Sequence, residues 1–157
     1  MPKPQKTENR SREKSRSGAS RSGRRQAILV LGAHRSGTSA LTRVLSLRGA
    51  SLPASLMHAS SINPRGFFES RRIYELHERI LADLGSSWDD LAPLSDSWIH
   101  SGIGQNFLKE MAEAVRVEFQ DSPLFVVKDP RVCRLVPFWL AVLDELGGDP
   151  LFVLPVR

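Results

Sequence analysis

Cysteine and long apolar segments are the two features that this sequence most lacks. Cys133 is the only cysteine among 157 residues, which excludes an internal disulfide and is typical of a reducing compartment. No apolar segment reaches the roughly 20 residues that a membrane-spanning helix needs, and no segment has the apolar core of a secretory signal. We therefore expect a soluble, cytoplasmic protein in which Cys133 is a packing residue of a helix.

Acidic residues are scarce only at the start of the chain. Residues 1–25 contain nine Lys and Arg against two Glu, a net charge of +7, whereas the remainder contains 13 basic and 15 acidic residues, a net charge of −2. Because this first segment also has no aromatic residue, we predict a disordered basic tail. Contact of the tail with a nucleic acid or a membrane surface stays open, while Glu8 and Glu13 argue against a transit peptide.

A loop bounded by two glycines follows the first apolar segment, Ala27–Leu31. Gly32 and Gly37 permit a turn that a Cβ would crowd, so that backbone N–H groups can point inward. The helix expected next has free N–H groups and a positive dipole end at its start, both of which favour an anion. Its first residues include the hydroxyl residues Ser36, Thr38 and Ser39.

The lysine of the usual nucleoside-triphosphate loop is absent. In the pattern G-x-x-x-x-G-K-[ST], Gly32, Gly37 and Ser39 fit, but Thr38 occupies the lysine position. Arg35 supplies the positive charge instead, and its planar guanidinium suits phosphate or sulfate oxygens. The loop is therefore predicted to bind a phosphate compound, although not in the usual triphosphate manner.

Short apolar segments alternate with helical patterns along residues 26–157. We expect strands at 27–31, 124–128 and 151–156, and helices at 36–48, 70–84, 104–120 and 132–146, the last bent near Pro137. Residues 50–63 and 86–100 are expected to be irregular. The alternation predicts an α/β, three-layer P-loop-like fold with a parallel sheet and flanking helices. Because Arg157 closes a strand with no helix after it, we expect the fold to be incomplete at its C-terminus.

The sequence also predicts whether several individual side chains are buried or exposed. In the helix expected at 36–48 the buried side should consist of Leu41, Val44, Leu45 and Leu47. The histidines outside the loop should be surface or loop residues without a role, namely His58, His77 and His100.

Three charged segments should meet at one edge of the predicted sheet. Ligands of parallel sheets bind beyond the carboxyl ends of the strands. The glycine loop follows the first strand, Lys128–Arg131 ends the second, and Arg157 ends the third. We expect these segments to lie around one crevice.

The chain contains, in order, the segments Gly32–Ser39 (GAHRSGTS), Asn63–Glu69 (NPRGFFE), Val126–Arg131 (VVKDPR), Leu135–Trp139 (LVPFW) and Phe152–Arg157 (FVLPVR). This ordered set resembles bacterial-type sulfotransferases that use 3′-phosphoadenosine-5′-phosphosulfate (PAPS). The resemblance extends over residues 26–157. It implies that residues 26–157 are the N-terminal part of a sulfotransferase-like domain.

The resemblance also implies roles for individual residues. Those of the loop would hold the 5′-phosphosulfate, with Arg35 compensating charge on the leaving phosphate and Arg157 contacting the 3′-phosphate. The loop residues concerned are His34, Arg35, Ser36, Gly37, Thr38 and Ser39. Later cofactor-binding segments of the family, and much of its acceptor pocket, would lie beyond Arg157. The implied acceptor is a hydroxyl or amine of a small molecule or glycan.

Sulfuryl transfer requires positive charge near the leaving oxygen and, for a hydroxyl acceptor, a general base. Lys128 is a further cation for the leaving group, and no metal is required. Glu69 is the first candidate for the base, because two aromatic residues before it could desolvate it; otherwise its carboxylate stabilises a helix dipole. Asp129 is the second, unless it caps a helix or pairs with Arg131. His34 is a third.

Two other readings stay open. The first is a P-loop kinase or NTPase without the usual lysine, in which Asp129 would be a Mg²⁺ ligand. The second is a non-catalytic nucleotide- or nucleic-acid-binding module that uses the basic tail.

Overall fold

A computed structural model describes residues 23–59, 63 and 66–156 of the chain. The predicted disorder of the basic tail falls on residues of which nearly all lie outside these ranges. Arg157, the predicted contact of the 3′-phosphate, lies outside them as well.

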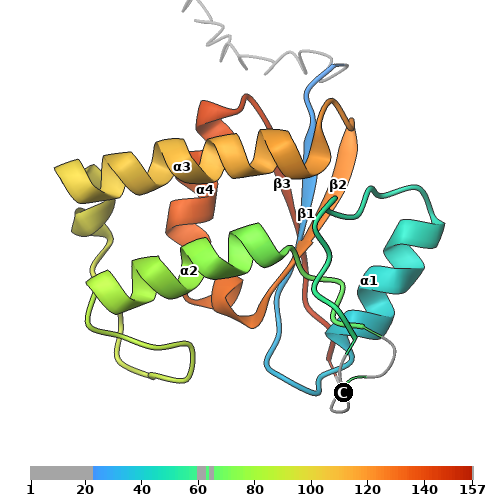
Figure 1. Ribbon diagram of the computed structural model, residues 1–157, viewed down its shortest axis with the longest axis horizontal. Helices are drawn as coiled ribbons and strands as arrows, with labels where there is room; N and C mark the ends of the chain where they lie inside the picture. Colours follow the sequence, from blue (N-terminus) through green and yellow to red (C-terminus); the bar gives the residue numbers. More distant parts are fainter. Residues whose placement is uncertain (1–22, 60–62, 64–65, 157) are drawn as a thin grey trace, which may run out of the picture.

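A three-stranded parallel sheet lies at the centre of the molecule (Figure 1). Its strands are β1 (Gln26–Val30), β2 (Leu124–Lys128) and β3 (Asp149–Val153). The order is β2-β1-β3, so β1 pairs with both neighbours. Along β1, Ala27 and Leu29 enter a core on one face of the sheet, and Ile28 and Val30 enter a core on the other. Burial on both faces explains the unbroken apolar sequence of β1.

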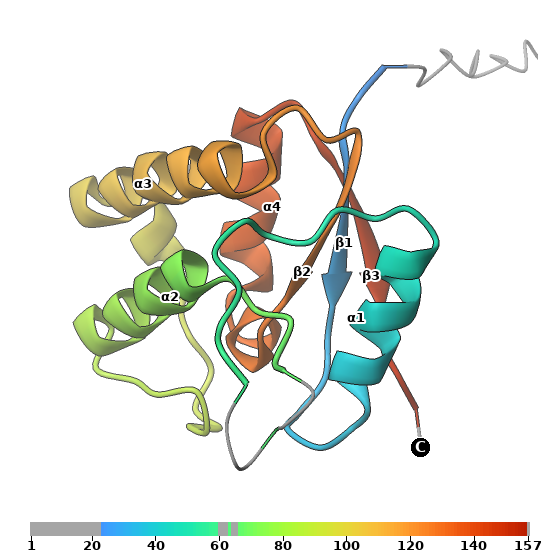
Figure 2. The same ribbon diagram turned by 45° about the vertical axis from the view of Figure 1, so that its right-hand side comes forward.

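Helices cover both faces of this sheet. Helix α1 lies on one face, while α2, α3 and α4 lie on the other (Figures 1 and 2). Their bounds are Thr38–Leu47 for α1, Arg71–Asp83 for α2, Gly102–Phe119 for α3 and Val136–Glu145 for α4. The predicted α/β arrangement of a parallel sheet with flanking helices is therefore confirmed. Within the described ranges no helix is long and apolar enough to cross a membrane.

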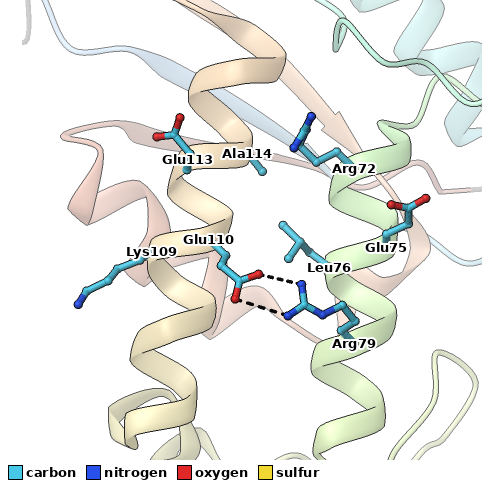
Figure 3. Close-up of a pocket in the computed structure, with 8 residues that line it drawn as sticks. All are labelled: Arg72, Glu75, Leu76, Arg79, Lys109, Glu110, Glu113 and Ala114. Atoms are coloured by element: carbon cyan, nitrogen blue, oxygen red, sulfur yellow. Dashed lines mark hydrogen bonds and ion pairs between the residues drawn. The ribbon is translucent and has the colours of Figure 1, made fainter.

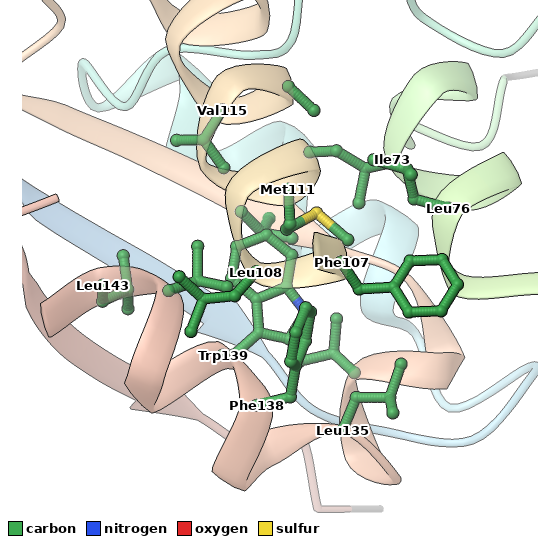
Figure 4. Packing of buried hydrophobic residues seen from close by; sticks show 14 of the residues in the cluster. Ile73, Leu76, Phe107, Leu108, Met111, Val115, Leu135, Phe138, Trp139 and Leu143 are labelled. Carbon is green, nitrogen blue, oxygen red and sulfur yellow. The ribbon is translucent and has the colours of Figure 1, made fainter. Parts of the chain in front are cut away.

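The larger core lies between the sheet and helices α2, α3 and α4 (Figure 4). Trp139 of α4 and Met111 of α3 are fully buried in it. Helix α2 contributes apolar residues that recur at helical spacing, among them Ile73, Leu76 and Ile80. This packing holds α2 against the sheet, and α2 carries several of the charged side chains described below.

The buried side of α1 differs from the prediction. Leu41 and Leu45 pack against the smaller core, but Val44 and Leu47 are 55% and 68% exposed. At 100° per residue the buried face is centred on Leu41, Leu45 and two buried threonines, Thr38 and Thr42. The Thr42 hydroxyl donates to the Thr38 carbonyl at 2.8 Å, so it is buried without losing a hydrogen bond. Hydrophobic spacing alone therefore placed the buried face too far round the helix.

Other boundaries also shift for local reasons. The first helix begins at Thr38 rather than residue 36, because Gly37 caps it with φ of 89°. Pro137 lies in the first turn of α4 and so begins that helix instead of bending it; a separate 3₁₀ helix, η2 (Pro130–Cys133), precedes it. The expected loop at 86–100 ends in another, η1 (Asp96–His100). The last strand, β3, ends at Val153 rather than at residue 156.

Close packing of η1 against the start of α3 generates a stability prediction. A Cβ at Gly104 would lie 2.2 Å from the Trp98 carbonyl oxygen and 2.8 Å from the Ile99 Cα. Because backbone atoms cannot rotate away, Gly104→Ala should lower the free energy of unfolding by about 1–3 kcal/mol, measured by urea denaturation. At Gly102 an added Cβ meets nothing within 4 Å, so Gly102→Ala is the matched control. Equal midpoints for the two variants would contradict the packing described here.

Candidate functional site

The loop after β1 is shaped by residues in the left-handed region of backbone conformation. Arg35 has φ of 63° and Gly37 has φ of 89°. Gly32 is required for another reason, because a Cβ there would lie 2.8 Å from the Ser36 Oγ and 2.9 Å from the Thr38 Cγ2. The loop therefore closes tightly on the start of α1, as its two glycines predicted.

The N-terminus of α1 is open to a ligand. No side chain of the described residues caps this helix. The Ser36 hydroxyl donates to the Ala33 carbonyl at 2.7 Å. The first N–H groups of an α-helix have no partner within the helix, and they carry its positive dipole end. This end of α1 can therefore donate to an anion.

A cavity of about 420 Å³ lies directly against this loop. It is lined by His34, Arg35, Gly37, Thr38, Ser39, Asn63, Phe67, Glu69 and Lys128. The structure thus brings the predicted loop residues together with Glu69 and Lys128, which are far apart in the sequence. Two of the predicted site residues, Ser36 and Asp129, do not line the cavity. Asn63 and Phe67 were not predicted as site residues, although both belong to the quoted segment Asn63–Glu69.

Glu69 is held at the cavity because the segment before α2 pairs with residues 55–57. The Met57 N–H donates to the Glu69 carbonyl and the Arg71 N–H donates to the Ser55 carbonyl, each at 2.8 Å. The next residue, Ser70, caps α2 by accepting from the Ile73 N–H at 3.1 Å. Glu69 therefore stands immediately before the start of a well-capped helix.

Glu69 and Lys128 form a buried ion pair in the wall of the cavity, where their side chains are 6% and 5% exposed. Burial raises the pKa of Glu69 above its ordinary value, against the opposing effect of the Lys128 ammonium group. Glu69 is therefore buried, and Phe67, one of the two aromatic residues before it, lines the same cavity. A carboxylate with a raised pKa beside a cation, in an anion-accepting cavity, can accept a proton once the cation is drawn away.

Both carboxylate oxygens of Asp129 have hydrogen-bond partners. One carboxylate oxygen accepts from the Arg131 N–H at 2.9 Å and from its guanidinium at 3.1 Å, and the other contacts His77 Nδ1 at 2.9 Å. Burial alone would raise the pKa of Asp129, but the hydrogen bond from His77 and the charge and hydrogen bonds of Arg131 lower it below its ordinary value. Both structural alternatives considered for Asp129, the cap of a short helix and the pair with Arg131, are therefore present.

His77 is completely buried, so its predicted surface position is wrong. It lies on α2, in the apolar stripe of that helix between Ile73 and Ile80. The Trp139 indole N–H donates to His77 Nε2 at 2.9 Å. Because indole nitrogen is only a donor, Nε2 must be the acceptor, so the ring is neutral and donates from Nδ1 to Asp129. The position of His77 among apolar residues of α2 was the signal that could have revealed its burial.

His34 and Cys133 complete the surroundings of the loop. The His34 ring meets the Trp88 ring edge-on, with centroids 4.5 Å apart. Partial burial lowers the pKa of His34, and the charges of Lys128 and Arg131 lower it further, so it is neutral near pH 7. Cys133 ends the short helix η2 but is exposed there, so its predicted role as a packing residue is wrong. Its Sγ accepts from the Gly32 N–H at 3.1 Å. The thiol therefore supports the first residue of the loop.

A larger cavity of about 550 Å³ lies away from the loop, between α2 and α3 (Figure 3). Its charged residues balance each other: Arg79 donates to Glu110 at 2.8 Å, and both side chains are about half exposed. Exposed ion pairs of this kind are screened by solvent. We therefore place the candidate functional site at the smaller, loop-lined cavity.

Comparison of this chain with family models, with curated proteins and with solved structures found no significant match. Among the described residues no group of three or more His, Cys, Asp or Glu is placed to hold a metal ion. The chemistry of the site is therefore inferred from its own geometry.

The lowered pKa of Asp129 predicts that the free energy of unfolding falls in acid. Its folded value lies below the ordinary value of 3.8, so the stability it contributes is present above pH 4 and lost as the pH falls further. Each pKa unit of lowering corresponds to about 1.4 kcal/mol. Asp129→Asn should lose on the order of 1–2 kcal/mol at pH 7 and show a flatter profile below pH 4 in urea denaturation. The exposed Asp121→Asn should follow wild type, and an unchanged profile for Asp129→Asn would refute the assignment.

Proposed function

We propose that this protein is a sulfotransferase that moves a sulfuryl group from PAPS to a hydroxyl or amine acceptor. The observation that carries the proposal is the single cavity that joins the open N-terminus of α1, Arg35, Lys128 and a buried carboxylate, Glu69. This arrangement supplies an anion-binding surface, a cation for the leaving group and a base, which are the three needs of sulfuryl transfer. The ordered sequence resemblance and the α/β framework add support, and a P-loop-like fold is part of this proposal.

The proposed transfer uses these residues as follows. The acceptor oxygen forms a bond to sulfur while the bond from sulfur to the phosphate oxygen breaks, and the acceptor proton passes to Glu69. Negative charge then develops on the leaving phosphate, where the α1 N-terminus, Arg35 and Lys128 can compensate it. Asp129 has both carboxylate oxygens engaged by His77 and Arg131, so within this proposal it is not the base.

Two observations argue against the first alternative, a P-loop kinase or NTPase. Thr38, at the usual lysine position, is buried and offers no charge. Asp129 faces His77 and Arg131, rather than the cavity, so it is poorly placed for Mg²⁺ there. The second alternative, binding through the basic tail, falls on residues outside the described ranges. Removal of residues 1–25 tests it, because a tail-dependent module would then lose all nucleotide binding.

Isothermal titration with adenosine 3′,5′-bisphosphate, and separately with ATP and Mg²⁺, tests the proposal. We expect metal-independent binding of the bisphosphate. Arg35→Ala should weaken it by about 10- to 100-fold, because a hydrogen bond to a charged group contributes about 1.5–3 kcal/mol. Both residues carry a Cβ, so the left-handed backbone at this position is strained equally in the two proteins.

The matched control for this titration is Arg48→Ala, which removes an exposed arginine at the other end of α1. It should bind the bisphosphate like wild type. Binding of ATP with Mg²⁺ alone, or equal bisphosphate affinity of the Arg35 and Arg48 variants, would overturn the proposal.

The ion pair predicts opposite effects of its two partners on anion binding. Glu69→Gln removes the negative charge from the cavity and frees Lys128, so the bisphosphate should bind at least as tightly as to wild type, whereas turnover falls. Lys128→Gln removes a cation and should weaken binding. Titration of both variants measures the difference; weaker binding by Glu69→Gln than by Lys128→Gln would show that the pair does not face the anion.

A further inference from the structure

Two contacts join the same pair of elements beside the cavity. Glu69, directly before α2, pairs with Lys128 at the end of β2. Two helical turns further along α2, His77 donates to Asp129, which directly follows Lys128. The two contacts therefore connect α2 to the end of β2 at two points, one inside the cavity wall and one behind it.

These contacts differ in what a ligand can do to them. Lys128 lines the cavity, so an anion bound there competes with Glu69 for the ammonium group. His77 is 0% exposed and Asp129 is 2% exposed, and neither lines the cavity. A bound anion can therefore open the first contact but has no access to the second.

The donor and the acceptor of the hydrogen bond between His77 and Asp129 are also fixed. Trp139 of α4 donates to His77 Nε2, which leaves only Nδ1 to donate, and Asp129 is its acceptor. Asp129 is held in turn by the Arg131 N–H and guanidinium. A third connection, from Arg131 to Glu78 of α2, ends on a side chain that is 46% exposed and is therefore weakened by solvent. The Arg131 guanidinium also lies over the Tyr74 ring of α2, 4.3 Å from its centroid. The His77–Asp129 contact is thus the fully buried hydrogen bond between α2 and the residue that follows β2.

We propose that His77 is a positioning residue: its hydrogen bond to Asp129 keeps α2 against β2, and so keeps Glu69 opposite Lys128, while a bound anion opens their ion pair. This inference rests on the proposed roles of Glu69 and Lys128 in the cavity. The proposed role also explains why a neutral imidazole is buried at a position where packing alone would not require a polar side chain.

Two substitutions separate the hydrogen bond from the filling of space. In His77→Asn the amide nitrogen takes the place of Nδ1 and can still donate to Asp129, but the side chain is too short to accept from Trp139. In His77→Gln the amide takes the place of Nε2, so it can accept from Trp139 but no longer reaches Asp129. Each variant loses one of the two hydrogen bonds and some stability, so exchange in α2 is compared with exchange in α3 to separate a general loss of stability from a loosening of α2.

The readout is amide hydrogen exchange in a Glu69→Gln background, where the ion pair is absent with or without a ligand. The amides to follow are Ile73 and Tyr74, which mark the start of α2 through their bonds to Ser70. Adding His77→Gln should accelerate their exchange at least about tenfold relative to amides of α3, whereas adding His77→Asn should not. A merely structural role for His77 would accelerate α2 and α3 together in both variants.

Bisphosphate titration of the single variants, in the otherwise wild-type protein, gives the functional arm. His77→Gln should bind at least as tightly as wild type, as expected for Glu69→Gln, because a displaced Glu69 no longer competes for Lys128, and His77→Asn should stay close to wild type; weaker binding by His77→Gln would contradict the inference. Equal behaviour of the two variants in exchange, or loss of α2 protection by Glu69→Gln alone, would overturn the inference. Failure of wild type to bind the bisphosphate would instead refute the proposed function, and the exchange result would still decide the role of His77.

Discussion

Val30 and Lys128 are paired residues at the carboxyl ends of two neighbouring parallel strands, and the site is arranged around that pairing. Because β1 continues directly into the glycine loop, the pairing sets Lys128 beside the loop although about 90 residues separate them in the chain. At this register the Asp129 side chain points toward α2 and the Lys128 side chain toward the cavity, since successive side chains of an extended segment point to opposite sides. A shift of one residue would exchange the two and remove the cation from the cavity.

Desolvated charge is the second constraint on this region. Glu69, Lys128, Asp129 and Arg131 are each less than a tenth exposed. Buried ion pairs seldom stabilise a fold more than apolar residues of the same shape would, because the loss of hydration offsets their attraction. Charges that are buried, paired and next to a cavity occur often at functional sites. The energetics of these residues therefore agree with a role in ligand chemistry rather than in stability alone.

The elements that were predicted well are those whose signal is local. The loop between Gly32 and Gly37 and strand β2 follow from residue type and from short apolar runs, and neither depends on a distant partner. The predictions that were wrong depend on three-dimensional neighbours. Val44 was expected to be buried because it is apolar, yet buried threonines turn α1 the other way. His77 was expected at the surface because it is polar, yet Asp129 and Trp139 satisfy both of its nitrogens inside the core.

By itself the sequence determined the alternation of strands and helices, the tight glycine loop and the charge carried by Arg35, because each depends on residues close together in the chain. Only the tertiary structure decided which carboxylate faces the cavity. Glu69 and Asp129 are both acids near Lys128, but packing of α2 on β2 places one in the cavity wall and surrounds the other with His77 and Arg131. That choice depends on how a helix and a strand from separate parts of the chain meet, and no local pattern contains it.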